Sequence, residues 1–229
     1  MAIFARAPMA GRCKTRLIPL LGREGAAEFQ RVLIADTVRK TRRLGGSVRL
    51  YVMAAGAARS SRETISFPSE VEWLSQRGAD LGARIEHALR FLLKLYPRAI
   101  IIGTDSPELP PRIFRVAFEE LRYCDAVLGP CPDGGYYLIG MQARGRSWLP
   151  RGLLDGVRWG SRWALRDTTQ RLLAAKLSYS LLEPFEDADR PRDLQRLFQR
   201  FAYNATLRRR APATWRFLSK GMGIANAEF

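Results

Sequence analysis

The first stretch with residue types suited to chemistry is the loop FARAPMAGRCKTRL, residues 4–17, which follows a short apolar start. Arg12, Lys14 and Arg16 gather there around Gly11. Lysine offers phosphate a compact point charge and arginine offers a bidentate fork. The spacing lacks the glycines of a Walker loop, and no GxGxxG fingerprint is present. From this loop alone, two interpretations remain: a phosphate-binding site and a solvated basic turn.

A carboxylate follows the most apolar strand candidate of the chain. Residues 99–102 read AIII, and the segment GTDSPELPP, residues 103–111, comes directly after them. Mg²⁺ bound to a nucleotide usually takes one or two carboxylates besides phosphate oxygens and water, and Asp105 has the position for that role. Helix capping is the alternative, since aspartate and serine are common caps. Ser106 can cap while Asp105 faces a ligand, so the pattern favours a functional Asp105.

A glycine pair lies between an acidic and an aromatic residue in GPCPDGGYYLIG, residues 129–140. Asp133 followed by Gly134 and Gly135 is typical of a hairpin turn. Glycines also let a ligand approach the backbone closely, and Tyr136 adds aromatic surface beside them. The segment therefore predicts either a plain turn or one wall of a binding site.

Two further carboxylates lie in EDADRPRDL, residues 186–194. Asp187 and Asp189 come just before a helix that is expected to begin at Pro191. We expect only one of the two carboxylates to face the site.

Apolar periodicity predicts an alternation of strands and helices along the chain. Strands are expected within residues 2–8, 48–55, 71–76, 99–107 and 179–189, with two short strands around a tight turn within 125–141. Helices are expected at 25–44, ending before Gly45-Gly46, and at 81–96, 110–124, 161–177 and 190–202. This order predicts an α/β fold with a mostly parallel sheet and right-handed crossovers.

The chemistry-bearing segments all follow predicted strands. Ligands of such sheets bind beyond the carboxyl ends of the strands, where loops lead into helices. The opening loop, Asp105, the Asp133 turn and the Asp187–Asp189 segment are therefore expected at one edge. We expect one domain over residues 1–203 and a basic C-terminal extension over 204–229, which is either an added packed helix or a loose tail.

The charge is strongly basic: 38 Lys and Arg against 22 Asp and Glu give a formal net charge of +16. The basic residues are scattered over every predicted helix, which is typical of solvated faces and argues against nucleic-acid binding as the main function. Three cysteines without CxxC spacing and one histidine, His87, make a zinc site or a hydrolase triad improbable. Without a signal-like start or an apolar run of membrane-spanning length, the cytoplasm is the expected compartment.

Six motifs in this order resemble a known family: FARAPMAGRCKTRL, GADLGARI, IIIGTDSPELPP, VLGPCPDGGYYLIG, VRWGSRWALRDT and DADRPRDL. The chain resembles the bacterial GT-A-type transferases once grouped as a domain of unknown function, also called radical-SAM/selenodomain-associated transferases. The resemblance covers about residues 2–198. It implies a single Rossmann-like, three-layer αβα domain similar to nucleotide-diphospho-sugar transferases, with a divalent Mg²⁺ or Mn²⁺ as cofactor.

The resemblance also implies roles for individual residues. Asp105 and Asp189 are expected to hold the metal, and Asp105 and Asp133 to be catalytic. The nucleotide-binding set is Arg6, Ala7, Pro8, Gly11, Lys14, Thr15, Arg16, Gly78, Leu81, Gly82 and Thr104. The acceptor-binding set is Gly134, Gly135, Tyr136, Trp159 and Ser161. The chain departs from the family pattern where DxDTPEDL becomes DADRPRDL, with Arg190 for threonine and Arg192 for glutamate.

These features together favour a metal-dependent transferase that uses a nucleotide-sugar donor and a small acceptor. The KTRL run also resembles the KSRL-type loop of 2-phospholactate guanylyltransferases. Nucleotidyl transfer from an NTP to a phosphorylated small acceptor is therefore the alternative reaction. A non-catalytic scaffold and a nucleic-acid-binding protein are the alternatives outside the enzyme class.

Overall fold

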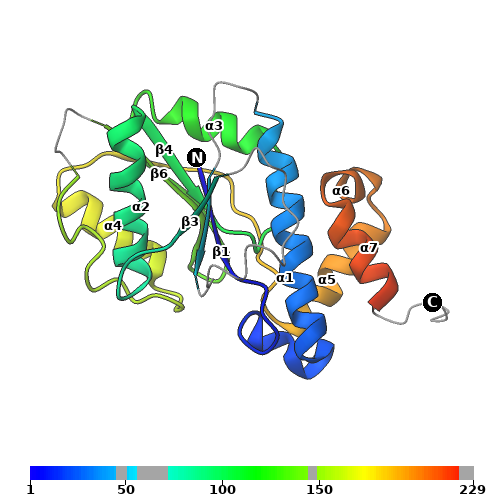
Figure 1. The fold of residues 1–229 in the computed structure, drawn as a ribbon. Helices are drawn as coiled ribbons and strands as arrows, with labels where there is room; N and C mark the ends of the chain where they lie inside the picture. Colours follow the sequence, from blue (N-terminus) through cyan, green and yellow to red (C-terminus); the bar gives the residue numbers. More distant parts are fainter. Residues whose placement is uncertain (45–50, 56–71, 144–148, 222–229) are drawn as a thin grey trace.

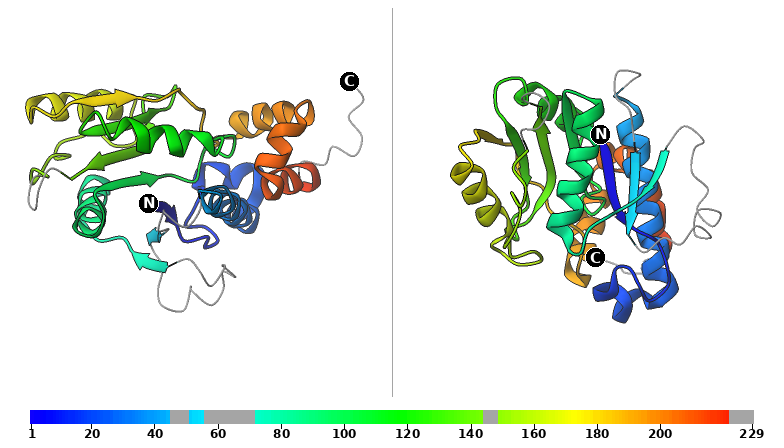
Figure 2. Two further views of the ribbon diagram at one scale, coloured as in Figure 1. Left: turned by 90° about the horizontal axis from the view of Figure 1, so that it is seen from above. Right: turned by 60° about the vertical axis from the view of Figure 1, so that its left-hand side comes forward.

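The structure is a computed structural model of the chain that describes residues 1–44, 51–55, 72–143 and 149–221. Over these residues helices lie on both sides of one twisted sheet, and the helices within residues 191–221 lie beyond the first helix, residues 18–42 (Figures 1 and 2). The expected three-layer αβα arrangement is confirmed.

The sheet of the described residues has seven strands in the order β3-β2-β1-β4-β6-β5-β7. The strands are β1 Ala2–Arg6, β2 Tyr51–Ala55, β3 Glu72–Ser75, β4 Arg98–Ile102, β5 Ala126–Pro130, β6 Tyr136–Gln142 and β7 Tyr179–Leu181. Only β6 runs against its neighbours: it pairs antiparallel with β4 and with β5, while the other pairings are parallel. The mostly parallel sheet and the short strand pair within 125–141 are therefore as predicted.

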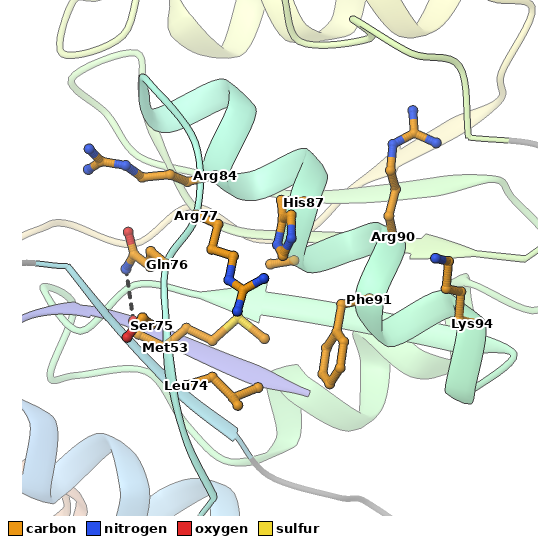
Figure 3. Close-up of a pocket in the computed structure, with 11 residues that line it drawn as sticks. Met53, Leu74, Ser75, Gln76, Arg77, Arg84, His87, Arg90, Phe91 and Lys94 are labelled. Atoms are coloured by element: carbon orange, nitrogen blue, oxygen red, sulfur yellow. Dashed lines mark hydrogen bonds between the residues drawn. The ribbon is translucent and has the colours of Figure 1, made fainter. Parts of the chain in front are cut away.

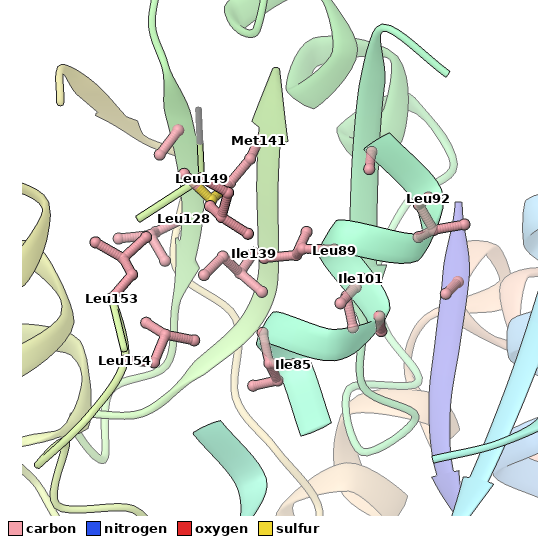
Figure 4. Close-up of a cluster of buried hydrophobic side chains, with 14 of the residues drawn as sticks. Ile85, Leu89, Leu92, Ile101, Leu128, Ile139, Met141, Leu149, Leu153 and Leu154 are labelled. Carbon is pink, nitrogen blue, oxygen red and sulfur yellow. The ribbon is translucent and has the colours of Figure 1, made fainter. Parts of the chain in front are cut away.

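The two faces of the sheet are covered by different helices. The helices are α1 Ile18–Arg42, α2 Leu81–Leu95, α3 Arg112–Glu120, α4 Ala164–Ala174, α5 Pro191–Ala202, α6 Ala205–Arg210 and α7 Pro212–Gly221. One core contains α2 and α4, and the core on the opposite face contains α1 and α3. Along β4, Ile101 belongs to the first core and Ile100 and Ile102 to the second, as the alternation of a doubly covered strand requires. Figure 4 shows Ile85 and Leu89 of α2 packing toward Ile101 and Ile139 in the first core.

The first helix begins earlier than the sequence pattern indicated. The expected start was residue 25, but α1 begins at Ile18 and contains a break at Gly22, whose φ is 71° and ψ is 175°. Pro19 lies at the start of the first segment, where proline is tolerated. Glycine then takes the positive φ that reorients the chain before the long amphipathic part. The expected stop at Gly45-Gly46 and the first residues of the strand predicted at 48–55 lie outside the described residues.

The C-terminal helices α6 and α7 share a core with α1 and α5. Leu207, Ala211 and Leu218 are buried there against Phe29 and Leu33. Trp215 stacks at 5.6 Å on Phe198 of α5. The extension that we propose to begin at residue 204 therefore packs against α1 and α5 as far as residue 221. No helix among the described residues is both long and apolar enough to cross a membrane.

One buried carboxylate joins α1 to α7. Asp36, which is 1% exposed, accepts hydrogen bonds from the backbone N–H groups of Ala213 (3.3 Å) and Thr214 (2.8 Å). These two amides belong to the first turn of α7, where backbone donors have no partner inside the helix. The carboxylate therefore acts as a helix cap from another element.

We expect Asp36→Ala to lower the free energy of unfolding by about 2 kcal/mol, because two buried amides lose their acceptor. Urea unfolding measures the loss. Glu24→Ala, which removes an exposed carboxylate of the same helix, is the control and is expected to change the free energy by less than about 0.5 kcal/mol. Equal effects of the two substitutions would contradict the capping role.

Candidate functional site

Four segments meet at the carboxyl edge of the sheet. They are the loop after β1, the segment after β4, the turn between β5 and β6, and the segment before α5. Their side chains line two adjoining cavities of about 420 and 300 Å³. The convergence of these segments at one edge, predicted from the sequence, is what the structure shows.

A buried lysine ties three of the four segments together. Lys14 Nζ lies 2.9 Å from Oδ1 of Asp105 and 3.3 Å from Oδ1 of Asp189, and it donates to the carbonyl oxygen of Ala188 at 2.8 Å. Its side chain is 3% exposed. All three ammonium donors therefore have partners, which is the usual condition for burying a charge.

The backbone of Lys14 is itself unusual. Its φ of 44° and ψ of 42° lie in the left-handed region, where residues with a side chain are uncommon. It precedes the short 3₁₀ helix Thr15–Leu17, and this turn brings Arg16 to the same carboxylate, with Nη1 2.7 Å from Oδ2 of Asp189. The strained conformation thus places two cations on one aspartate.

The charges of this cluster stabilise one another. Burial favours the neutral amine of Lys14, but Asp105 and Asp189 outweigh it, and the pKa of Lys14 is raised. Burial of Asp189 favours its neutral acid, but Lys14 and Arg16 outweigh that effect and lower its pKa. Both groups are therefore held in their charged forms at neutral pH.

A short hydrogen-bond chain holds Asp105 from the other side. Gln30 Nε2 on α1 donates to Thr104 Oγ1 at 3.2 Å, and Thr104 Oγ1 donates to Asp105 Oδ1 at 3.2 Å. Gln30 and Thr104 are both 3% exposed. Helix α1 thus fixes the orientation of the carboxylate that follows β4.

The larger cavity, which we call the nucleotide-side cavity, brings together much of the predicted nucleotide set. Its lining includes eight residues singled out from the sequence: Arg6, Lys14, Thr15, Arg16, Leu81, Thr104, Asp105 and Asp189. Ala7, Pro8, Gly11, Gly78 and Gly82 do not line it. Lys14 faces this cavity with its charge engaged by the two aspartates, so its contact with a ligand phosphate stays a prediction.

The smaller cavity, the acceptor-side cavity, contains most of the predicted acceptor set. Asp133, Gly135, Tyr136, Trp159 and Ser161 line it. The Tyr136 ring meets that of Trp159 edge-on at 5.9 Å, and this pair forms an aromatic wall. Gly134 does not line the cavity.

The expectation that only one of Asp187 and Asp189 faces the site is wrong. Both carboxylates line the acceptor-side cavity, together with Asp105 and Asp133. The reason is geometric: residues two apart in an extended segment project to the same side. Ala188 between them projects the other way, is 2% exposed and belongs to the core under α5.

Asp187 and Asp133 are the carboxylates of this group that make no ion pair with the described residues, and Asp187 is the more buried of the two. Burial, with the neighbouring charges of Asp133, Asp189 and Asp105, raises its pKa to about 6, and Lys14 only partly opposes this. Asp189, by contrast, has each oxygen engaged by a basic side chain. The ionised form of Asp187 is therefore disfavoured where it stands, and a cation bound beside it would relieve this.

The donor set fits a metal that takes part of its coordination from a ligand. No cluster of three or more His, Cys, Asp or Glu that could hold a metal occurs among the described residues. Mg²⁺ at nucleotide sites needs only one or two protein carboxylates, however, with phosphates and water supplying the rest. Asp105, whose side chain is 44% exposed, and Asp187 both line the acceptor-side cavity and could supply these carboxylates.

Three of the predicted site glycines allow close packing within the protein. A Cβ at Gly78 would lie 2.6 Å from the backbone N of Arg84, and one at Gly82 would lie 3.0 Å from Nε1 of Trp159. A Cβ at Gly134 would lie 2.1 Å from the carbonyl oxygen of Arg162. These glycines therefore hold the α2 start and the β5–β6 turn against neighbouring backbone, which positions the cavity walls.

Several lining residues were not predicted. Gln76 and Arg84 line the nucleotide-side cavity, and Asp187 was considered without being assigned. Gln76 ends the strand candidate 71–76, so its place at the carboxyl edge was a usable signal. Arg162, Arg190, Arg192 and Arg196 line a third cavity of about 390 Å³ that contains Asp133, Asp187 and Asp189 as well. Scattered arginines gave no signal of this grouping.

The fold is of the Rossmann-like, GT-A type. The chain belongs to the family described as an uncharacterized protein conserved in bacteria (DUF2064), whose model matches residues 37–161. This confirms the resemblance seen in the motifs. No curated protein matches the chain.

Solved structures resemble the chain over most of its length. A protein from Desulfovibrio desulfuricans G20, provisionally named a nucleotide-diphospho-sugar transferase, is 28% identical with a TM-score of 0.84, covering 96% of this chain and 93% of its own. The inositol-1-phosphate CTP transferase from T. maritima is 13% identical with a TM-score of 0.52, covering 99% and 98%. CMP:2-keto-3-deoxy-manno-octonic acid synthetase complexed with CTP is also 13% identical with a TM-score of 0.52, covering 88% and 97%. The last two show likeness of fold alone.

We expect Gly134→Ala to lower the free energy of unfolding by about 2 kcal/mol more than Gly160→Ala. Both glycines have positive φ, 89° and 70°, so both substitutions strain the backbone. Only the Cβ at position 134 also meets the Arg162 backbone, since nothing lies within 4 Å at position 160. Thermal and urea unfolding compare the two variants, and equal losses would show that the turn is not packed as described.

Proposed function

We propose that the protein is a metal-dependent transferase that acts on a nucleotide-activated donor, with a nucleotide sugar as the first candidate. The observation that carries the proposal is the junction of two cavities at Asp105. A cationic cavity with Arg6, Arg16 and Arg84 lies on one side, and an acidic cavity with Asp133 and Asp187 lies on the other. This arrangement suits a donor whose diphosphate lies in the basic cavity and whose transferred group lies at the acidic one.

The nucleotide-side cavity suits the donor. Arg6, Arg16 and Thr15 are exposed side chains at its rim, and arginine forks match phosphate oxygens. Lys14 also lines this cavity, so its positive charge can attract the phosphates, as the family resemblance implies. Its three N–H groups meanwhile keep their partners Asp105, Asp189 and Ala188. The name of the Desulfovibrio protein, whose chain is 28% identical, supports a nucleotide-sugar donor.

We assign the metal to Asp105 and Asp187, in place of the earlier expectation of Asp105 and Asp189. Asp189 is already paired with Lys14 and Arg16, whereas Asp187 lines the same cavity as Asp105 and makes no ion pair with the described residues. A bound Mg²⁺ or Mn²⁺ would polarise the phosphates and neutralise charge on the leaving group. The role of Asp189 is then to hold the two basic side chains beside the diphosphate.

The chain's own residues would serve the transfer by position and charge. In glycosyl transfer an acceptor oxygen attacks the anomeric carbon and the nucleoside diphosphate leaves; Arg16 and Lys14 stabilise the charge that develops on it. Asp133 is exposed at the acceptor-side cavity, with Oδ1 accepting from the N–H of Gly135 at 2.9 Å. From there it can orient the acceptor hydroxyl or take its proton.

A specific observation favours nucleotidyl transfer as the second candidate. The third cavity is lined by five arginines, Arg16, Arg162, Arg190, Arg192 and Arg196, and by five carboxylates, Asp133, Glu186, Asp187, Asp189 and Asp193. Among these arginines, Arg162, Arg190 and Arg196 make no ion pair with the described residues. Such a group is suited to an acceptor that carries phosphate or carboxylate. In that reaction an acceptor phosphate oxygen attacks the α-phosphorus of an NTP and pyrophosphate leaves. The name of the inositol-1-phosphate CTP transferase describes a reaction of this kind on the same fold.

We expect one nucleotide base to raise the melting temperature in a manner that depends on Mn²⁺. Thermal unfolding with UDP, GDP, CDP, ADP and the corresponding triphosphates, each with and without Mn²⁺, measures this. A ligand at about a hundred times its dissociation constant adds about 2.7 kcal/mol, which is a shift of a few degrees for a domain of this size.

Asp187→Asn is expected to remove the Mn²⁺-dependent part of that shift. It is the cleaner variant because Asp105→Asn also breaks the Lys14 ion pair and can destabilise the fold. Glu119→Gln, an exposed carboxylate near the end of α3, is the control and should keep the full shift. A Mn²⁺-dependent shift that survives in Asp187→Asn would contradict the metal assignment; no nucleotide shift at all would contradict the transferase.

If the arginine-lined cavity holds the acceptor, the double substitution Arg190→Thr and Arg192→Glu is expected to weaken binding of a sugar phosphate by about tenfold or more, since charge-assisted hydrogen bonds are lost. Binding of a panel of sugar 1-phosphates by calorimetry measures this, with the nucleotide shift expected to persist. Arg115→Gln, an exposed arginine of α3, is the control. Product analysis then separates the reactions: pyrophosphate indicates nucleotidyl transfer, and a nucleoside diphosphate indicates glycosyl transfer.

A further inference from the structure

A second basic groove lies outside the site described above. It has a volume of about 480 Å³ and lies between the edge of the sheet at β2 and β3 and the outer side of α2. Its lining is Met53, Leu74, Ser75, Gln76, Arg77, Arg84, His87, Ala88, Arg90, Phe91 and Lys94 (Figure 3). This volume is in the range of sites for small organic ligands.

The floor of the groove is apolar and well fixed. Met53 and Leu74 belong to adjacent strands, and Phe91 projects from α2 beside them. The Phe91 ring meets the ring of Tyr51 edge-on at 5.8 Å, and the hydroxyls of Tyr51 and Tyr96 are 2.7 Å apart. A flat apolar group can therefore rest on a surface that is already ordered.

The rim of the groove carries one sign of charge. On α2, the basic side chains of Arg84 and Lys94 lie on the same side as His87 and Phe91, and Arg77 extends toward them from the segment after β3. None of the described residues that line the groove is a carboxylate. A cleft with one sign of charge concentrates ligands of the opposite sign.

The basic side chains of the rim differ in whether they are hydrogen-bonded or ion-paired within the protein. Arg90 donates to the carbonyl oxygen of Pro150 at 2.8 Å and lies 3.9 Å from Glu86, and Arg84 donates to the carbonyl oxygen of Gly78 at 3.1 Å. Arg77 and Lys94 are exposed and make no ion pair or hydrogen bond with the described residues. These two charges are available to a ligand.

The groove adjoins the nucleotide-side cavity without being part of it. Gln76 and Arg84 line both, and Gln76 is fixed by hydrogen bonds to the carbonyl oxygens of Met53 (2.8 Å) and Ala5 (3.3 Å). The wall between the two spaces is therefore anchored to β1 and β2. Asp105 and the other acidic residues of the site do not line the groove.

We propose that this groove is a second ligand site, and that it binds a small organic anion with a flat apolar body. The apolar body would rest on Met53, Leu74 and Phe91. The acidic group would be bound by Arg77 or by Lys94, which lie on either side of Phe91 (Figure 3), with His87 as a further donor. This proposal does not rest on the transferase function, because the groove is defined by its own residues.

The test compares two dyes with the same aromatic body, 8-anilino-1-naphthalenesulfonate and its uncharged relative N-phenyl-1-naphthylamine. The wild-type protein is expected to bind the sulfonate at least about tenfold more tightly, because a charge-assisted contact adds to the apolar one. The double substitution Arg77→Gln and Lys94→Gln is expected to remove that advantage while binding of the uncharged dye is kept. Fluorescence titration measures all four affinities.

The matched control is the double substitution Arg115→Gln and Lys220→Gln, which removes one exposed arginine and one exposed lysine from α3 and α7. It is expected to leave binding of the sulfonate dye within twofold of wild type. An equal loss in the control would mean that net charge alone attracts the dye, and no loss in the groove variant would place the dye elsewhere; either result overturns the proposal. Displacement of the dye from wild type by a nucleotide would also overturn it, since the groove would then be part of the nucleotide site.

Discussion

The buried ammonium of Lys14 is the interaction on which the arrangement of the site depends. It joins the loop after β1, the end of β4 and the segment before α5 through two carboxylates and one carbonyl. Breaking a buried ion pair by removing one partner typically costs about 3–5 kcal/mol, because the other charge is left uncompensated. The left-handed backbone at Lys14 is tolerated because this network fixes it, and the same turn presents Arg16 to Asp189.

The charges of the site are divided by position. Arginines and lysine lie toward the nucleotide-side cavity, the aspartates lie at its junction with the acceptor-side cavity, and a second group of arginines lies beyond them. Although the chain has a formal net charge of +16, the residues that line these cavities are therefore divided into basic and acidic groups. An acidic centre between basic walls attracts a cation and an anionic ligand to adjacent places, which a general attraction for polyanions would not do.

The sequence was sufficient to predict the order of elements and the edge at which the site forms, because hydrophobic periodicity and crossover handedness determine both. It could not show that Lys14 is paired with two carboxylates inside the protein, since residue type does not reveal a partner 91 or 175 positions away. Gln30 and Arg84 were missed for a related reason: both lie within helical patterns, where a polar residue is by default solvated. The pairing of Asp187 with Asp189 on one side required the extended backbone between them to be known.

The Lys14 network also bears on how a metal and a nucleotide would bind. A dication beside Asp105 adds positive charge close to an ammonium that the same carboxylate already neutralises. Two such cations repel each other strongly in a partly buried site unless more negative charge arrives with them. Asp187 supplies part of that charge, and the phosphates of a nucleotide supply the rest. For the proposed metal site, the electrostatics therefore favour joint binding of metal and nucleotide over binding of the metal alone.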